Sequence, residues 1–574
     1  MRILCLILLC IAVNCPARDA YVLLSGGGTP LSNNYSQYLQ AEALSAWLQR
    51  SYPADSVWVF FGCGNQPGQP SVLADVHRRT AHGNLALDSW LPGALPHNRP
   101  ATREVFLRAL KEEILPAVHA GGTLYLLVGD HGSLAKSAPK ESVITLWQLQ
   151  RGDGHRSWFT NPTEELGVTE LRDVLRAGLG QGRVVFCMTQ CHSGGFHFLG
   201  GPRAVAVPAS WFAGPVPAWA QGDAAAPLAV AGFTSTDEPS IAAGCDPDPD
   251  PDVWAGYERY FPENLLGCDL ISGQTRAAPQ ASFASAHAAA VRVDQTIDKP
   301  RSTSEQYLAL WAETLERLAG EPTLVPATRA QVQLYQQSVD RGLADGNAGP
   351  GFQACRAGWS QEVARLAAQA PAVADALRQG RRADLETLHP PGHQRSGNRA
   401  ERRRLWQEVL RPAWKEAVQR GEVGLPDGVV AFERHLLALE DQHREFMFPD
   451  GSGNALLNEI YWQSGYAVPD QTVPAHAEEV ARWAAERSAQ IHAWAEGASD
   501  PAVRAAAGIL ATSSAAGRHM PRVLRAETAA ERTLFYRRIA AAWVFLWNTH
   551  DTAALEELRR LQALESTPLP PVAR

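Results

Sequence analysis

The first half of the chain alternates short apolar runs with segments of helical periodicity, and this alternation constrains the fold more than any other feature. The segments 36–50, 102–120 and 169–182 carry apolar residues at helical spacing. The apolar runs that separate and flank them lie at residues 21–26, 56–62, 123–132, 183–190 and 227–235. Strands of a parallel sheet read as continuous apolar runs because helices cover both faces. The sequence therefore predicts an α/β fold, with a mostly parallel sheet flanked by helices.

The pattern changes near residue 300. Ser302 and Glu305 have the spacing of a capping box, which predicts the start of a helix, and Leu308, Trp311 and Leu315 then share one helical face. Only helical patterns are predicted from there on. We expect an α/β domain over residues 18–300 and an all-α domain over residues 301–574.

Residues 1–17 have the pattern of a secretory signal peptide. Arg2 precedes an apolar run from Ile3 to Val13, and the small residue Ala17 follows. This run is too short to cross a bilayer, and we expect no transmembrane segment elsewhere. The mature protein is therefore expected outside the cytoplasm, either periplasmic or secreted.

The cysteines are too sparse for a disulfide scaffold. Of nine cysteines, three lie in residues 1–17, so six remain in a long mature chain. We expect Cys187, which lies inside an apolar run, to be an inert buried thiol. Cys245 and Cys268 are the pair that we expect to form a disulfide.

The composition is that of an ordinary globular protein. At 574 residues, 45% hydrophobic and 20% charged, the chain is long enough for two or more domains, and it leaves the oligomeric state open. The net charge of -8 provides no basic surface of the kind that binds nucleic acid, so a nucleic-acid partner is not expected.

A histidine and a cysteine each follow an apolar run directly. His131 lies in "DHGS", and Cys191 lies in "TQCHSGG". Ligands of open α/β sheets bind beyond the carboxyl ends of the strands, so both side chains are expected in one crevice. A thiol becomes a good nucleophile when a nearby histidine takes its proton. The backbone N–H groups of Gly132 and Cys191 are expected to stabilise the oxyanion formed by attack on an amide carbonyl.

These motifs resemble those of the caspase-haemoglobinase superfamily of cysteine peptidases. "DHGS" resembles the histidine motif of legumain-type peptidases, and "CHSGG" resembles the cysteine motif of metacaspases. Two further segments, "SNNYSQYLQAE" and "TSTDEPSIAAGC", are also similar to legumain segments. The resemblance covers roughly the first half of the mature chain. It implies a caspase-like fold and a cysteine endopeptidase that acts on peptide or protein substrates. We expect no cofactor and no metal site. In that interpretation His131 is the general base, and Cys191 is the nucleophile that forms a thioester.

The chain departs from the family pattern around the primary specificity pocket. Legumains and metacaspases carry a carboxylate two residues before the cysteine, and Thr189 occupies that position here. An arginine of the legumain pattern is replaced by Ser36. The family's residue preferences are therefore not carried across. By position, Ser235, Asp237 and Ser240 are expected to line the substrate pocket together with Thr189.

Four nearby polar residues have other expected roles. Asn33 or Asn34 is expected to orient His131. His192 is expected to point away from the site. Asp130 is expected to be a turn or capping group, because an aspartate next to a turn more often caps than catalyses.

Several alternatives remain open. Cys187, Cys191, His192 and His197 include zinc-ligand residue types, although their spacing is unlike a zinc knuckle. "SGGGTP" lacks the third glycine of a dinucleotide fingerprint, and "CDPDPDPD" lacks the glycine and glutamate of a calcium loop. On the same Cys–His dyad, a transpeptidase or ligase would resolve the thioester with an amine. A degenerate peptidase domain retained as a binding module would not turn over at all.

Overall fold

The computed structural model of the chain describes residues 18–341, apart from short gaps, and residues 522–571. The gaps are 29–32, 67–71, 81–82, 92, 136–138, 148–163, 224–226, 247–248, 250–253 and 295. The expected signal peptide and residues 342–521 of the expected helical domain lie outside the described residues.

A seven-stranded sheet organises the first half of the chain. In spatial order its strands are β12 (Arg301–Ser302), β11 (Val230–Thr234), β10 (Arg183–Met188), β6 (Thr123–Gly129), β1 (Ala20–Ser25), β2 (Val57–Phe61) and β5 (Asn98–Arg99). Every neighbouring pair is parallel except β11 with β12. Each of the five apolar runs matches one of these strands, with β1 beginning one residue before its run, so the predicted α/β class and the mostly parallel sheet are confirmed.

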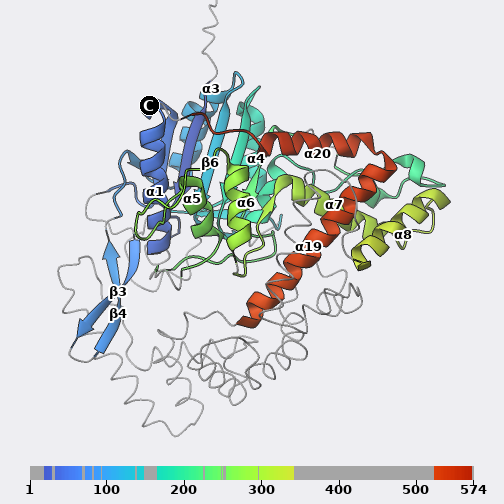
Figure 1. The fold of residues 1–574 in the computed structure, drawn as a ribbon. Coiled ribbons are helices and arrows are strands. Elements are labelled where there is room, and N and C mark those ends of the chain that lie inside the picture. The colour runs from blue at the N-terminus through green and yellow to red at the C-terminus, as the bar shows by residue number, and fades with distance from the viewer. Residues whose placement is uncertain are drawn as a thin grey trace, which may run out of the picture.

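Helices cover both faces of the sheet because successive strand residues point to opposite sides. In β1, Tyr21 and Leu23 belong to the core that contains apolar residues of α1 (Tyr35–Ser51), α5 (Tyr257–Leu266) and α6 (Phe283–Val293). Val22 and Leu24 belong to a second core with residues of α2 (Arg103–Ala109), α3 (Leu115–Val118) and α4 (Val168–Gly178). The layers can be followed in Figure 1.

The described helices of the second half pack onto this body. The predicted capping box opens α7 (Thr303–Leu318): the Ser302 hydroxyl accepts the Glu305 N–H at 3.2 Å, and the Glu305 carboxylate accepts the Ser302 N–H at 2.8 Å. The others are α8 (Pro326–Arg341), α19 (Arg522–Thr549) and α20 (Thr552–Glu565). Leu308, Leu546 and Leu558 of α7, α19 and α20 join the same core as the β10 residue Phe186 (Figure 1). None of the helices in the described residues is long and apolar enough to cross a bilayer.

Two small antiparallel sheets are additions to the predicted pattern. The hairpin of β3 (Val72–Thr80) and β4 (Gly83–Leu91) projects from the body (Figure 1). β7 (His131–Leu134), β8 (Ser142–Leu146) and β9 (Glu164–Gly167) form a three-stranded sheet. The expected run 123–132 therefore ends as a strand at Gly129, and the chain turns at Asp130 into β7.

The cysteine predictions have mixed outcomes. Cys187 is a buried free thiol, as predicted. The predicted disulfide between Cys245 and Cys268 is wrong, because both cysteines are free. The sulfur of Cys245 lies instead 3.3 Å from His131, whereas Cys268 forms an isolated bridge with Thr275.

Candidate functional site

The register of two neighbouring strands brings the predicted histidine and cysteine to one edge of the sheet. In the parallel pair of β6 and β10, Val128 lies beside Met188, and the next N–H, from Thr189, donates to the Val128 carbonyl at 2.9 Å. His131 and Cys191 each follow three residues after this paired position. Both residues therefore emerge at the carboxyl edge, where ligands bind in open α/β sheets.

Gly132 lies against the backbone of Cys191. A Cβ atom added to Gly132 would lie 2.0 Å from the carbonyl oxygen of Cys191 and 2.6 Å from the Cγ of Gln190. Any side chain larger than hydrogen would therefore push the two segments apart. The glycine that the motif "DHGS" provides is what lets the histidine segment approach the cysteine segment.

The Cys191 thiol is partly buried and held by a backbone group. The Ala242 N–H donates to its sulfur at 3.2 Å. Burial raises the pKa of Cys191 to about 12, nearby Cys245 raises it further, and the Ala242 N–H opposes the rise. At neutral pH Cys191 is therefore a neutral thiol and not a preformed thiolate.

The turn before His131 is fixed by a buried carboxylate. Oδ1 of Asp130 accepts the N–H of Gly27 at 2.8 Å and the N–H of His131 at 2.6 Å. Burial raises the pKa of Asp130 to about 7. The predicted capping role of Asp130 is confirmed by these contacts. The side chain therefore sets the backbone direction of the histidine segment.

A second thiol contacts the imidazole. The Sγ of Cys245 lies 3.3 Å from Nδ1 of His131. Cys245 has a left-handed backbone with φ of 61°. Its N–H donates to the Glu258 carboxylate at 3.0 Å, and its carbonyl accepts the Asn34 side-chain amide at 2.6 Å. Asn34, which was expected to orient His131, thus acts on the residue that contacts the imidazole.

Two of the expected pocket residues, Thr189 and Ser235, are buried, and their hydroxyl groups form hydrogen bonds within the protein next to the cysteine segment. The Thr189 hydroxyl donates to the Val128 carbonyl and accepts from the Gln40 amide, both at 3.3 Å. The Ser235 hydroxyl lies within hydrogen-bonding distance of the carbonyls of Thr189 and Gln190, at 2.9 and 3.1 Å. Both residues stabilise the turn that presents Cys191.

The other two expected pocket residues lie beside the cysteine segment. The Ser240 carbonyl accepts the N–H of His192 at 2.8 Å, and its hydroxyl accepts from the Lys299 ammonium at 3.0 Å. The Asp237 carboxylate accepts from Arg301 at 3.2 Å. Their roles in substrate binding stay predictions.

The residues of the zinc alternative point in different directions. Both ring nitrogens of His197 lie 2.9 Å from threonine hydroxyls, those of Thr303 and Thr234. Nδ1 of His192 lies 2.8 Å from the Glu238 carbonyl, away from the dyad as expected. Cys187 is in the hydrophobic core. Within the described part of the chain, no three His, Cys, Asp or Glu side chains are grouped so as to hold a metal ion.

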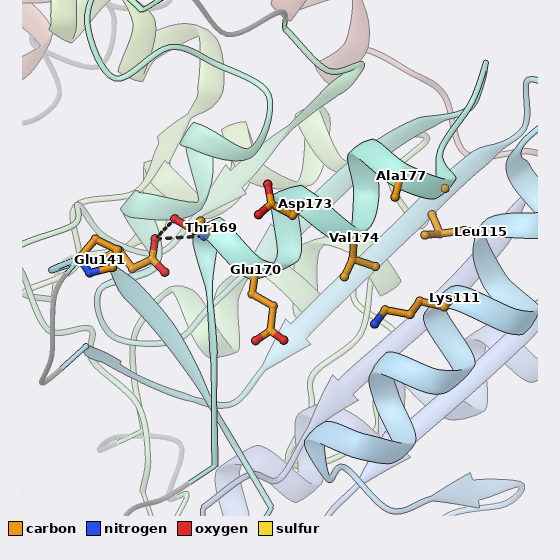
Figure 2. Close-up of a pocket in the computed structure, with 10 residues that line it drawn as sticks. Lys111, Leu115, Glu141, Thr169, Glu170, Asp173, Val174 and Ala177 are labelled. Atoms are coloured by element: carbon orange, nitrogen blue, oxygen red, sulfur yellow. Dashed lines mark hydrogen bonds between the residues drawn. The ribbon is translucent and has the colours of Figure 1, made fainter.

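A cavity of about 710 Å³ lies elsewhere, between Lys111 and Leu115 on one side and α4 on the other (Figure 2). Neither His131 nor Cys191 lines it. The Glu141 carboxylate in its wall accepts the N–H and hydroxyl of Thr169 at 3.0 and 2.6 Å, as the dashed lines in Figure 2 show. This acid is engaged in fixing the start of α4, so the edge of the sheet remains the better candidate site.

Neither the protein-family models nor the curated proteins include a match to this chain.

Cys245 and Glu258 are the residues of this site that the sequence did not reveal. Cys245 lies 114 residues from His131. It ends the segment "TSTDEPSIAAGC", whose resemblance pointed to Ser235, Asp237 and Ser240 but gave this cysteine no role. The one local signal is Gly244 before Cys245, since glycine adopts positive φ angles readily. In the structure both residues have positive φ, and the loop is sharply turned there. Strained backbone of this kind is typical of functional sites, but it does not predict which residue Cys245 contacts.

Proposed function

We propose that this protein is an exported cysteine endopeptidase of the caspase-haemoglobinase type, in which Cys191 is the nucleophile and His131 is the general base. The observation that carries the proposal is the strand register, which places the two residues equally far beyond the paired Val128 and Met188. The close approach of Gly132 to the Cys191 carbonyl supports it.

The proposed reaction begins from a neutral thiol. The Cys191 sulfur attacks the carbonyl carbon of the scissile peptide bond while its proton passes to His131. The C–N bond then breaks, and His131 returns the proton to the departing amine. Water resolves the thioester, giving the new carboxyl end and restoring the thiol. Proton transfer during attack suits a thiol whose pKa is raised to about 12, since little thiolate exists beforehand.

The oxyanion and the substrate have named positions in this proposal. The backbone N–H groups of Gly132 and Cys191 stabilise the oxyanion. Asp237 and Ser240 border the substrate beside the cysteine segment, and Thr189 and Ser235 support it from below. The carboxylate of Asp237 is paired with Arg301, which lowers its availability for a basic substrate side chain.

A peptide-library cleavage profile tests the proposal. The wild type is compared with Cys191→Ala, His131→Ala and the control Cys268→Ala. The control removes a free thiol whose backbone pairs with Thr275, away from the site. We expect the first two variants to lose roughly a thousandfold or more in kcat/KM, since nucleophile and base act as one unit, and the control to match the wild type. Equal turnover by all four proteins would contradict the proposal.

Two further outcomes would replace it by another function. If an added amine is incorporated into the product in preference to water, the dyad serves a transpeptidase. If no peptide is cleaved and thiol labelling is unaffected by Cys191→Ala, the fold serves as a binding module.

A further inference from the structure

We infer that Cys245 is a positioning residue of this site: its sulfur accepts a hydrogen bond from Nδ1–H of His131 and so leaves the other ring nitrogen, Nε2, to take the proton of Cys191. The inference rests on the proposed function for its kinetic consequence. The contact itself, at 3.3 Å, does not depend on that proposal.

The tautomer of His131 decides whether the ring can act as a base. A neutral imidazole has one N–H and one lone pair, and the partner of one nitrogen fixes which form is present. If Nδ1 carries the proton, Nε2 has the lone pair that a general base needs. A hydrogen-bond acceptor at Nδ1 selects this form, as the buried aspartate does in serine peptidases. Cys245 occupies that place here.

The thiol of Cys245 is suited to accept and not to react. Burial, followed by the charges of Glu258 and Asp130, raises the pKa of Cys245 well above its usual range. The group therefore stays neutral and keeps its S–H, so either partner of the contact with His131 can be the donor. We take the sulfur as the acceptor because the side-chain amide of Gln37 also points to it, at 3.9 Å. The backbone N–H directed at the Cys191 sulfur is closer, at 3.2 Å, and this shorter hydrogen bond favours a developing thiolate more strongly.

The backbone of Cys245 is held so that the thiol faces His131. A non-glycine residue with a φ of 61° is in a left-handed conformation that costs about 1 kcal/mol or more. Glu258 and Asn34 compensate by bonding both of its backbone groups. The next residue, Asp246, exchanges hydrogen bonds of 2.9 and 3.0 Å with Ser36. A strained residue bonded on both sides is typical of a functional position.

The proton count is simple. In the resting state His131 carries one proton, on Nδ1, donated to the Cys245 sulfur, and Cys191 carries the other. During attack the Cys191 proton moves to Nε2, and the imidazolium keeps its Nδ1–H directed at Cys245. No proton enters or leaves Cys245 at any step.

Several ionisable groups surround this contact and contribute to its pH dependence. They are Asp130 at the end of β6, Glu258 on α5, Asp246 beside Cys245, Asp298 before β12, and the Cys191 thiol. Burial raises the pKa values of Asp130 and Glu258 to about 7. A pH profile of one variant therefore mixes these titrations, and only a difference between matched variants reports on Cys245.

The kinetic test compares Cys245→Ala and Cys245→Ser with the wild type and Cys268→Ala. We expect Cys245→Ala to lower kcat about tenfold with little change in KM. Removing a group that orients a functional histidine lowers activity about 10- to 100-fold, and a neutral sulfur should fall at the lower end of that range. The acidic limb of its kcat/KM profile should move to lower pH, because the imidazolium loses an acceptor. Cys245→Ser keeps an acceptor and should recover most of the activity. An unchanged or faster Cys245→Ala enzyme, with an unshifted profile, would overturn the inference.

Nitrogen NMR of the His131 ring tests the inference even in a protein that cleaves nothing. We expect the Nδ1–H form in the wild type, in Cys245→Ser and in Cys268→Ala, and a mixture of both forms in Cys245→Ala. A dominant Nε2–H form in the wild type would overturn the inference whatever the activity. Loss of cleavage with the expected tautomer pattern would refute the endopeptidase and leave the positioning role of Cys245 intact. Matching thermal unfolding curves establish that each variant is folded.

Discussion

Alkylation of Cys191 by iodoacetamide should accelerate about tenfold for each pH unit across a range of roughly 6 to 10. Only the thiolate reacts, and burial raises the pKa of this thiol to about 12. At pH 7 the thiolate fraction is then about one in 10⁵, against roughly 3% for an ordinary cysteine. The populations differ by roughly three thousandfold. A more basic thiolate is also a better nucleophile, which recovers roughly 40-fold, so the net rate should be about a hundredfold below that of a free thiol.

The assay follows the labelled Cys191 peptide by mass spectrometry at each pH, with N-acetylcysteine as the reference thiol. His131→Ala should keep the same slope, because the rise reflects direct ionisation of the thiol. A flat profile around neutral pH would refute the reasoning. It would mean that Cys191 exists as a thiolate beside a protonated His131 despite the burial.

Two further predictions concern stability and the approach of the two segments. Burial raises the pKa of Glu565, which bonds Ser304, to about 8 from an ordinary value of 4.5, so its contribution to stability is present below pH 4.5 and is lost as the pH rises through 8. This loss in the free energy of unfolding is at most about 5 kcal/mol. Urea unfolding at several pH values should show that Glu565→Gln removes much of the decline in stability with pH. Parallel plots of stability against pH for the two proteins would contradict the assignment. Gly132→Ala should abolish cleavage and lower the melting temperature, because its Cβ would meet the Cys191 carbonyl at 2.0 Å, whereas Gly214→Ala meets nothing within 4 Å and should be neutral. Full activity of Gly132→Ala would show that the segments lie farther apart than described.

The sheet could be predicted from the sequence because its signals are local. The strands β2, β6, β10 and β11 each lie within one apolar run, and β1 begins one residue before its run. The start of α7 follows from a capping box that is complete within four residues. The hairpin of β3 and β4 lacked such a signal, since its strands carry charged and small polar residues among the apolar ones. The turn at Asp130 depends on a contact with Gly27, which lies 103 residues earlier.

The site divides in the same way. The common position of His131 and Cys191 at one edge was predictable, because each follows its own strand and parallel strands end at one edge. The third group was not, since the contact of Cys245 with His131 needs a loop fixed by Asn34 from α1's start and Glu258 from α5. Three segments that are far apart in the sequence must fold before that thiol has a position.

Burial raises the pKa values of Cys191 and Cys245, so both thiols are protonated in the resting state. This makes a group that orients the proposed base, His131, useful at the site. Because both thiols are protonated, the proposed mechanism does not start from an ion pair. It depends on a base that is already in the correct tautomer when substrate arrives. A carboxylate at Nδ1 would select that tautomer more strongly, but it would add a negative charge beside Cys191 and raise the thiol pKa further. A neutral sulfur selects the tautomer without that cost. The left-handed backbone of Cys245 thus serves the chemistry proposed for Cys191, with a cysteine in a position where serine peptidases use an acid.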